Sequence, residues 1–324
     1  LPHGVQGRGV CLISGGFDSA VAAWLLLKRG VALDYVFCNL GGEAYERSVV
    51  SVAKVLADEW SWGDRPTLHV VDFAPVLTAL RRTVTPRYAQ VVLKRLMYRT
   101  AEAVAGEVGA RAIVTGESLG QVSSQTLDNL RAIDEVADLP VFRPLIGLDK
   151  QEIIQRAERI GTAVLSAHVR EYCAITEDRP VTRARAEAAR DEEARVDPDG
   201  GILAAAVAGR KRMDLRALSA TDLLQPYLFA TEIAKGARVV DCRDAAQFEA
   251  WHYPGAVWRD AGDLAAQFKD LDRSARYVLY CAHGIQSAVV AELMQGAGYE
   301  AYSFKGGVRE LRRFAEHQVL GAGG

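Results

Sequence analysis

Long apolar runs are missing from this chain of 324 residues. No stretch approaches the ~20 consecutive apolar residues that a membrane-spanning helix needs, so we expect no membrane-embedded part. The first residues, Leu1-Pro2-His3-Gly4, have no basic and apolar leader of the kind that directs secretion. We therefore expect a cytoplasmic protein. An initiator Met is also missing, which is compatible with a fragment of a longer chain.

Cysteine is scarce as well, and the five residues are odd in number and widely spaced. This pattern excludes a disulfide scaffold and fits a reducing compartment in which single thiols can be catalytic. No two cysteines are two residues apart and no His lies at ligand spacing from them, so we expect no structural zinc site. The five are Cys11, Cys38, Cys173, Cys242 and Cys281.

An excess of charge of either sign is also absent, because 39 Lys and Arg nearly balance 41 Asp and Glu. The formal net charge of -2 excludes a chain coated in positive charge, but it permits a local basic face for nucleic acid. The hydrophobic share of 49% is typical of a soluble globular protein. The length predicts two domains.

The first half of the chain alternates between strand and helix character. Strand-like runs at residues 10–13, 31–40, 67–73 and 112–115 are separated by helix-like stretches at 20–28, 44–59 and 88–106. This alternation predicts an α/β domain over residues 1–180, with a parallel sheet covered on both faces. Its ligand site should lie at the carboxyl ends of the strands, where Ser14, Phe37 and Gly116 fall.

The composition shifts between residues 181 and 218, where Ala, Arg and Glu dominate. We interpret this segment as a helical connector of solvated helices; a basic surface that touches RNA is the alternative. A second, smaller α/β domain is expected at residues 219–320, with strands at 238–241, 277–280 and 302–304 and helices at 245–251 and 287–295.

The first candidate site is the turn Ser14-Gly15-Gly16-Phe17-Asp18-Ser19, which joins a predicted strand to a predicted helix. Its backbone N–H groups and the positive end of the helix dipole form an anion site, and its glycines allow close approach of phosphates. Ser14 and Ser19 can donate hydroxyls, whereas Asp18 would act through Mg²⁺ or by holding the loop. The order of residues differs from the Gly-Lys-Thr loop of kinases and GTPases.

This order resembles the pyrophosphatase loop (PP-loop) of enzymes that adenylate a carbonyl oxygen with ATP. Together with the segments 116–127 and 144–150 and the tripeptide Glu171-Tyr172-Cys173, it resembles the tRNA 4-thiouridine synthetase (tRNA uridine 4-sulfurtransferase) family. The resemblance implies a PP-loop ATP-pyrophosphatase domain. It also implies ATP contacts at Leu12, Ile13, Phe37, Cys38, Lys94, Gly116 and Gln125.

To this ATP site we add the loop residues Ser14, Gly15, Gly16 and Ser19, and also Lys150, which follows an Asp at a predicted helix start. Plainer roles remain open for several of these residues. Leu12 and Ile13 could be strand core, and Lys94 and Lys150 could be solvated helix charges.

The second candidate site is Cys281, which follows the predicted strand 277–280 and precedes a helix. Backbone N–H groups and the positive end of a helix dipole favour a thiolate there, and the same donors would hold a persulfide. By itself, a cysteine at a strand end is usually a small buried hydrophobe. Here, however, it is accompanied by the segments 239–244, 248–249, 252–256 and 306–308, and together they resemble a rhodanese domain, whose loop cysteine carries the transferable sulfur.

Two other cysteines are interpreted by their surroundings. Cys242 lies inside a strand-like motif, so we expect it to be part of the core. The family resemblance gives the Cys of Glu-Tyr-Cys, here Cys173, a resolving role in which it forms a redox-active disulfide with Cys281. A buried structural Cys is the alternative.

The combined expectation is an ATP-dependent sulfurtransferase that converts uridine at position 8 of tRNA to 4-thiouridine. Catalysis would involve Asp18, Cys173 and Cys281, with ATP as substrate, Mg²⁺ on its phosphates and a cysteine desulfurase as sulfur donor. Full-length members of the family carry a THUMP region ahead of the ATP domain, so we expect either a fragment or a short form. The alternatives are sulfur relay to a carrier protein for thiamine thiazole and a nucleotide-binding or sulfur-carrier module without tRNA activity. A homodimer is possible, and we expect no membrane partner.

Overall fold

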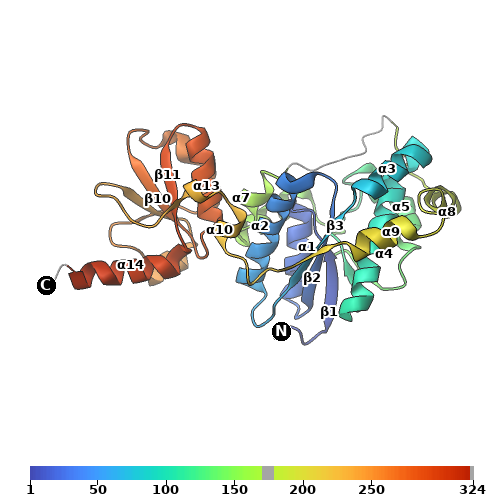
Figure 1. The fold of residues 1–324 in the computed structure, drawn as a ribbon, viewed down its shortest axis with the longest axis horizontal. Helices are drawn as coiled ribbons and strands as arrows, with labels where there is room; N and C mark the ends of the chain where they lie inside the picture. The colour runs from blue at the N-terminus through green and yellow to red at the C-terminus, as the bar shows by residue number, and fades with distance from the viewer. Residues whose placement is uncertain (170–178, 322–324) are drawn as a thin grey trace. The chain divides into compact units, whose positions relative to one another are not determined.

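The computed structural model describes residues 1–169 and 179–321, which form two compact units. Unit 1 comprises Leu1–Ile160 and Val169–Arg216, and unit 2 comprises Gly161–His168 and Ala217–Gly324. Each unit contains its own sheet, and the two are described separately below (Figure 1). In the described part of the chain, no helix combines the length and the apolar character needed to cross a membrane.

Unit 1 is built on a six-stranded sheet in the order β5-β4-β1-β2-β3-β6. All neighbouring strands are parallel except β3 and β6, which are antiparallel. The central strands are buried on both faces, which explains their continuous apolar sequences. The strands are β1 (Arg8–Leu12), β2 (Ala32–Asn39), β3 (Thr67–Asp72), β4 (Ile113–Val114), β5 (Val141–Phe142) and β6 (Lys211–Asp214).

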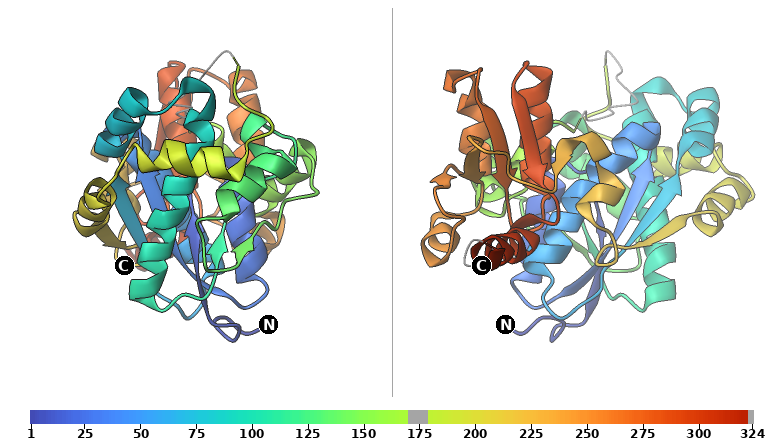
Figure 2. Two further views of the ribbon diagram at one scale, coloured as in Figure 1. Left: turned by 90° about the vertical axis from the view of Figure 1, so that its right-hand side faces the viewer. Right: turned by 60° about the vertical axis from the view of Figure 1, so that its left-hand side comes forward.

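Helices cover both faces of this sheet, as expected for a parallel sheet. One face carries α1 (Phe17–Leu27), α2 (Gly42–Trp60) and α6 (Lys150–Arg159). The other side is organised around α4 (Ala89–Val108), and α9 crosses α4 in Figure 2, left. Around α4 lie α3 (Ala74–Thr83), α5 (Leu127–Asp134), α8 (Ala186–Ala194) and α9 (Gly201–Ala208), with the short 3-10 helices η1 (Pro86–Tyr88) and η2 (Ser123–Gln125).

The sequence analysis expected a helical connector at residues 181–218. In the structure, the described residues up to Arg216 are instead part of unit 1. Arg95 of α4, whose side chain is only 1% exposed, pairs with Glu193 of α8 at 2.7 Å. The strand β6 then joins the sheet edge beside β3. Composition alone missed this packing because about half of the residues of the segment are exposed and the buried ones are scattered singly or in pairs along it.

Unit 2 contains a five-stranded parallel sheet in the order β7-β11-β10-β8-β9. Its small core joins Val239, Val278, Tyr280 and Phe304 from the strands to Leu311 from the last helix. The strands are β7 (Phe229–Ala230), β8 (Arg238–Asp241), β9 (Val257–Trp258), β10 (Arg276–Tyr280) and β11 (Glu300–Phe304). The helices are α7 (Ala163–Ser166), α10 (Ala220–Leu223), η3 (Pro226–Leu228), α11 (Ala245–Ala250), α12 (Ala261–Gln267), η4 (Phe268–Asp270), α13 (Ile285–Gly296) and α14 (Gly307–Gly321).

The α/β class expected from the sequence, with two parallel sheets, is confirmed. Every strand and helix named in the sequence analysis is present, most of them with shifts of one to three residues at their ends. The short strands β5, β6, β7 and β9 and several helices have no counterpart in that analysis. Two-residue strands such as β5 and β9 carry too little pattern to be recognised in a sequence.

Candidate functional site

The loop that follows β1 closes on itself through its two serines. The Ser19 hydroxyl donates to the Gly16 carbonyl at 3.2 Å, and the Ser19 oxygen accepts from the Ser14 N–H, also at 3.2 Å. Gly15 has φ +77°, and a Cβ there would lie 3.2 Å from the Cα of Val49. Glycine is therefore required at position 15, both for the backbone conformation and for space. The loop leads into α1, whose first N–H groups have no intrahelical partners.

Gly116 lies against the same loop, at the end of the strand segment next to β1. A Cβ on Gly116 would lie 2.6 Å from the carbonyl carbon of Asp18 and 2.6 Å from the nitrogen of Ser19. The strand order reverses between β1 and β4, because β2 and β3 lie on the other side of β1. Gly116 thus meets the sequence-distant residues Asp18 and Ser19 at the switch point of the sheet, where ligands of such folds bind.

Asp18 is held by two side chains from other parts of unit 1. Lys150, the first residue of α6, donates to the two Asp18 carboxylate oxygens at 3.0 and 3.2 Å. Gln121 donates to the carboxylate at 3.0 Å. The Lys150 ammonium also lies 5.5 Å from the centre of the Phe17 ring. The structure therefore brings Lys150 to the loop, so it is more than a solvated helix charge.

The apolar residues predicted to contact ATP flank the loop at the ends of β1 and β2. Ile13 is 4% exposed and Phe37 is 1% exposed, with the Phe37 ring packed edge-on against Tyr45 of α2. Cys38 belongs to the core cluster on the opposite face, beside α3 and α4. Burial raises the pKa of the Cys38 thiol, and the Lys94 ammonium offsets part of that effect. Leu12 is half-buried and packs against the core clusters on the α4 side, so strand core accounts for part of this set.

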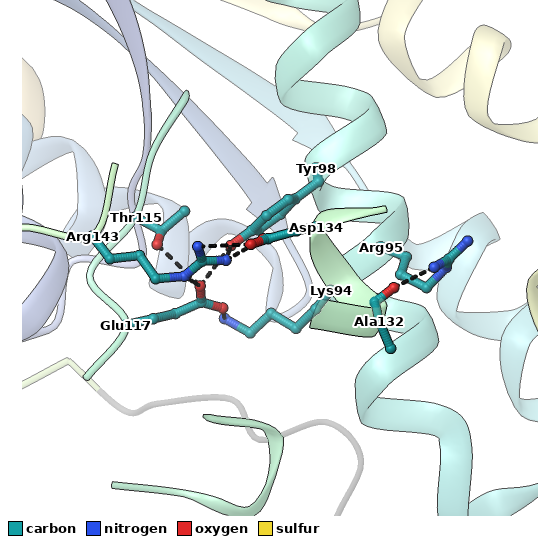
Figure 3. A network of polar contacts seen from close by, with 8 residues as sticks. All are labelled: Lys94, Arg95, Tyr98, Thr115, Glu117, Ala132, Asp134 and Arg143. Atoms are coloured by element: carbon teal, nitrogen blue, oxygen red, sulfur yellow. Dashed lines mark hydrogen bonds and ion pairs between the residues drawn. The ribbon is translucent and has the colours of Figure 1, made fainter. Parts of the chain in front are cut away.

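A buried carboxylate that the sequence analysis missed, Glu117, lies next to Gly116 and is 2% exposed (Figure 3). Its Oε2 atom accepts from the Tyr98 hydroxyl at 2.5 Å, from the Arg143 Nε at 2.9 Å and from the Thr115 hydroxyl at 3.1 Å. Arg143 is in turn paired with Asp134. Burial opposes ionisation, but the charges of Lys94 and Arg143 together with the hydrogen bonds from Tyr98 and Arg143 outweigh it, so the pKa of Glu117 is lowered.

The second oxygen of Glu117 faces Lys94. The distance from Glu117 Oε1 to Lys94 Nζ is 3.8 Å, and this oxygen has no hydrogen-bond partner within residues 1–169 and 179–321. Gln125, which is 8% exposed, likewise leaves its side-chain oxygen without a partner in that part of the chain. Two buried acceptors and one ammonium group are thus available to a polar ligand.

The described residues contain no group of three or more His, Cys, Asp or Glu side chains placed to hold a metal ion. Asp18 is the carboxylate of the Ser14–Ser19 loop, and both of its oxygens accept from Lys150. Mg²⁺ commonly binds through one or two carboxylates and substrate phosphates, so Asp18 is the residue of this loop that would be available to it.

In unit 2, Cys281 follows β10 and is 1% exposed. Its sulfur accepts from the Gly284 N–H at 3.1 Å and from the N–H and hydroxyl of Ser287 at 3.5 and 3.3 Å. Gly284 has φ +83° and caps α13, so the loop turns sharply beneath the sulfur. Ser303 lies 2.8 Å from the Ser287 hydroxyl, which extends the polar contact behind Cys281. These donors can hydrogen-bond to a negatively charged sulfur at this position.

Two of the remaining cysteines, Cys11 in unit 1 and Cys242 in unit 2, are buried. Cys11 is fully buried in β1, and burial raises the pKa of its thiol to about 12. Cys242 is 2% exposed at the end of β8, and burial raises its pKa well above the ordinary value. Both are core residues with poorly nucleophilic thiols. Cys173, with Glu171 and Tyr172, lies outside the described residues.

Comparisons with protein families match both units. Residues 4–197 match the family described as thiamine biosynthesis protein (ThiI), and residues 226–313 match the rhodanese-like domain. The first match covers more than half of the chain. The family therefore includes α8 and the start of the segment that composition alone assigned to a connector.

Individual relatives agree with these families. A tRNA sulfurtransferase of Pyrobaculum aerophilum is 41% identical over 307 residues, which cover 94% of this chain and 63% of that protein. A tRNA sulfurtransferase of Aliivibrio salmonicida is 38% identical over 312 residues, covering 93% and 63%. The chain thus spans less than two thirds of the length of these curated relatives.

A solved structure is similar to a large part of the chain. It is a 4-thiouridine synthetase in complex with RNA and bound ATP, and it is 37% identical with a TM-score of 0.63. The similarity covers 66% of this chain and 56% of the solved one.

Proposed function

Because this chain belongs to the family of the thiamine biosynthesis protein ThiI, we propose that it uses ATP to transfer sulfur to tRNA, converting uridine at position 8 to 4-thiouridine. The relatives named tRNA sulfurtransferase and the similar 4-thiouridine synthetase bound to RNA and ATP support this function.

One observation carries the proposal: a single chain holds a phosphate loop and a sulfur-anion loop. The loop of Ser14–Ser19 lies at the switch point of the first sheet and leads into the amino end of α1, whose first N–H groups can bind an anion. Cys281 lies among the donors of Gly284 and Ser287 at the end of β10 in the second. An enzyme that exchanges oxygen for sulfur needs an oxygen activated by a nucleotide and a reactive sulfur.

In the first step, the carbonyl oxygen at position 4 of the uracil attacks the α-phosphorus of ATP. Pyrophosphate leaves, the base loses its N3 proton, and an adenylated base forms. The loop would bind the departing phosphates, assisted by Lys150 and Lys94. Mg²⁺, held by the phosphates and Asp18, would supply charge neutralisation. The residues of this chain contribute orientation and positive charge, which are the main means of catalysing phosphoryl chemistry of this kind.

In the second step, a persulfide on Cys281 supplies the sulfur. Its terminal sulfur attacks carbon 4 of the base and AMP leaves, which gives a disulfide between the base and Cys281. The Cys173 thiolate then attacks the Cys281 sulfur, so the thiolated base is released and a Cys173–Cys281 disulfide forms. A cellular dithiol reduces that disulfide, and a cysteine desulfurase restores the persulfide.

The proposed sulfur relay predicts that Cys281→Ala reduces tRNA thiolation from a desulfurase to below about 1% of wild type. Since the substituted side chain is in unit 2, tRNA-dependent release of pyrophosphate should persist. Mass spectrometry of 4-thiouridine and a pyrophosphate assay measure the two steps. Cys242→Ala is the matched control, because it removes another buried thiol of the same sheet. Retained thiolation in Cys281→Ala would contradict the relay.

The family description favours a second function, sulfur relay to a carrier protein for the thiazole of thiamine. In that case, Cys281 would still carry sulfur, but pyrophosphate release would not depend on tRNA. Absence of pyrophosphate release with any acceptor would instead indicate a nucleotide-binding or sulfur-carrier module.

A further inference from the structure

Exposed arginines gather along one short segment of unit 1, residues 179–185, which we term the arginine segment. Arg179, Arg183 and Arg185 on this segment are exposed, and so is Arg87 of η1 beside it. None of these four forms an ion pair with another residue of the described chain. They therefore differ from Arg95, Arg143 and Arg190 of the same unit, which are all paired with carboxylates.

The backbone of the arginine segment is held by buried side chains and by hydrogen bonds to a buried asparagine. Val181 and Ala184 are each 6% exposed and join a core cluster with residues of α4 and α5. Asn129 of α5, which is fully buried, donates to the Val181 carbonyl at 2.8 Å and accepts from the Ala184 N–H at 2.9 Å. The backbone that carries the arginines is thus fixed, which lowers the entropy cost of binding through them.

A chain of contacts links the arginine segment to the helices that carry Gln125 and Lys94, two residues of the candidate ATP site. The Val181 N–H donates to the Arg87 carbonyl at 2.9 Å. The second N–H of the Asn129 amide reaches the Ser123 carbonyl at 2.7 Å, at the start of the short helix that carries Gln125. Ser123 in turn bonds to Gln90, one helical turn before Lys94.

Exposed negative charge near the arginine segment is limited. Two exposed carboxylates, Asp128 and Glu187, lie nearby on α5 and α8. The whole chain carries a formal net charge of -2, so four unpaired arginines in one place are a local feature and do not reflect a basic composition. Unpaired guanidinium groups on a rigid backbone are suited to phosphate oxygens, which they can bind with two parallel hydrogen bonds.

From these contacts we propose that the arginine segment and Arg87 bind the phosphate backbone of the RNA substrate and guide it to the adenylation site. This inference rests on the proposed function, since it names the surface by which unit 1 holds tRNA. The arginines contact backbone phosphates and read no base sequence. Binding through them releases counterions and is therefore strongly salt-dependent.

The test measures binding of an unmodified, fluorescently labelled tRNA transcript to the full 324-residue chain as salt is increased. We expect Arg183→Glu/Arg185→Glu to weaken binding by roughly tenfold or more and to lower the slope of log K against log salt by about 1 to 2. Affinity for ATP should stay within about twofold of wild type, because neither arginine belongs to the ATP site. Arg183→Lys/Arg185→Lys retains the charge and should keep most of the salt slope.

The control is Arg111→Glu, which replaces an exposed arginine by glutamate. Arg111 precedes β4 and lies at the amino ends of the strands, whereas Ser14 and Gly116 follow the carboxyl ends. Equal tRNA affinity and salt slope in the double variant and this control would overturn the inference, and so would a wild-type chain that binds no tRNA. Impaired sulfur loading with unchanged tRNA binding would assign the surface to an acidic protein partner and would overturn it as well. If tRNA binding depends on the arginines but no thiolation occurs, the inference that this surface binds tRNA holds and the proposed function is wrong.

Discussion

Among single residues, Glu117 combines deep burial with several charged neighbours. Its carboxylate contacts Tyr98, Thr115 and Arg143 through one oxygen and faces Lys94 with the other. The positive neighbours make burial of this charge tolerable, since an ionised group in a protein interior needs partners. Glu117 thereby holds residues of α4, the β4 end and the β5 end in one network at the edge of the candidate ATP site.

Replacing Glu117 with Gln keeps the shape of the side chain but removes its charge. We expect this change to lower the free energy of unfolding by about 3 kcal/mol, because Lys94 loses its partner and Arg143 loses one of two. Asp134→Asn is the control, because Asp134 is 41% exposed and solvent screens its pair with Arg143. Asp134→Asn should lower the free energy of unfolding by less than about 1 kcal/mol. Urea denaturation at pH 7 measures the free energy of unfolding of both variants. An equal loss in Glu117→Gln and Asp134→Asn would contradict a special role for Glu117.

At the scale of elements, the edge strand β6 is attached to β3 partly through a buried histidine. His69 of β3 is 2% exposed, and its Nδ1 accepts from the Nε of Arg210, just before β6, at 3.1 Å. A protonated imidazole could not accept this hydrogen bond and would lie beside positive Arg210. Burial and the Arg210 charge accordingly lower the pKa of His69 below its usual value of 6.5.

This lowered pKa predicts a pH-dependent stability. The folded protein favours neutral His69, so the stabilising contribution is present above pH 6.5 and is lost as the pH falls through the folded pKa. The slope of the free energy of unfolding against pH that is due to His69 should not exceed about 1.4 kcal/mol per pH unit. Denaturation of wild type and His69→Gln between pH 7.5 and about 5 tests this, with exposed His252→Gln as control. An unchanged slope in His69→Gln would exclude His69 as its source.

At the scale of the whole molecule, each unit has a sheet, a core and a candidate site of its own. The candidate nucleotide site is in unit 1 and the candidate sulfur site is in unit 2. Binding of a ligand stabilises the part of a protein that contacts it, so the two sites can be probed separately in one chain.

ATP should therefore slow amide hydrogen exchange in residues 14–27 and 113–125 but leave the Cys281 loop, residues 281–287, unchanged. We expect at least about a tenfold slowing in the first set with ATP at 100 times its dissociation constant. Gly15→Val is the control without a functional loop, since a side chain there meets Val49 and the backbone has φ +77°. Equal slowing in that variant, or protection confined to the Cys281 loop, would contradict the assignment of ATP to the Ser14–Ser19 loop.

The sequence by itself determined the features that depend on neighbouring residues. The turn Ser14–Ser19 and the loop after Tyr280 follow strands and precede helices, and both were recognisable because strand, turn and helix start are adjacent in the chain. The strand at residues 238–241 was predicted with its observed bounds. Alternating apolar strands and helices were enough to predict two parallel sheets, since only covered faces accommodate such strands.

The tertiary structure alone decided which distant side chains meet. Glu117, Arg143 and Tyr98 are far apart in sequence, and residues 181–216 join unit 1 through buried pairs such as Arg95 with Glu193. A charged residue has the same sequence signal whether it is solvated or buried against a partner. Only the fold, by removing water and bringing opposite charges together, decides between these two states.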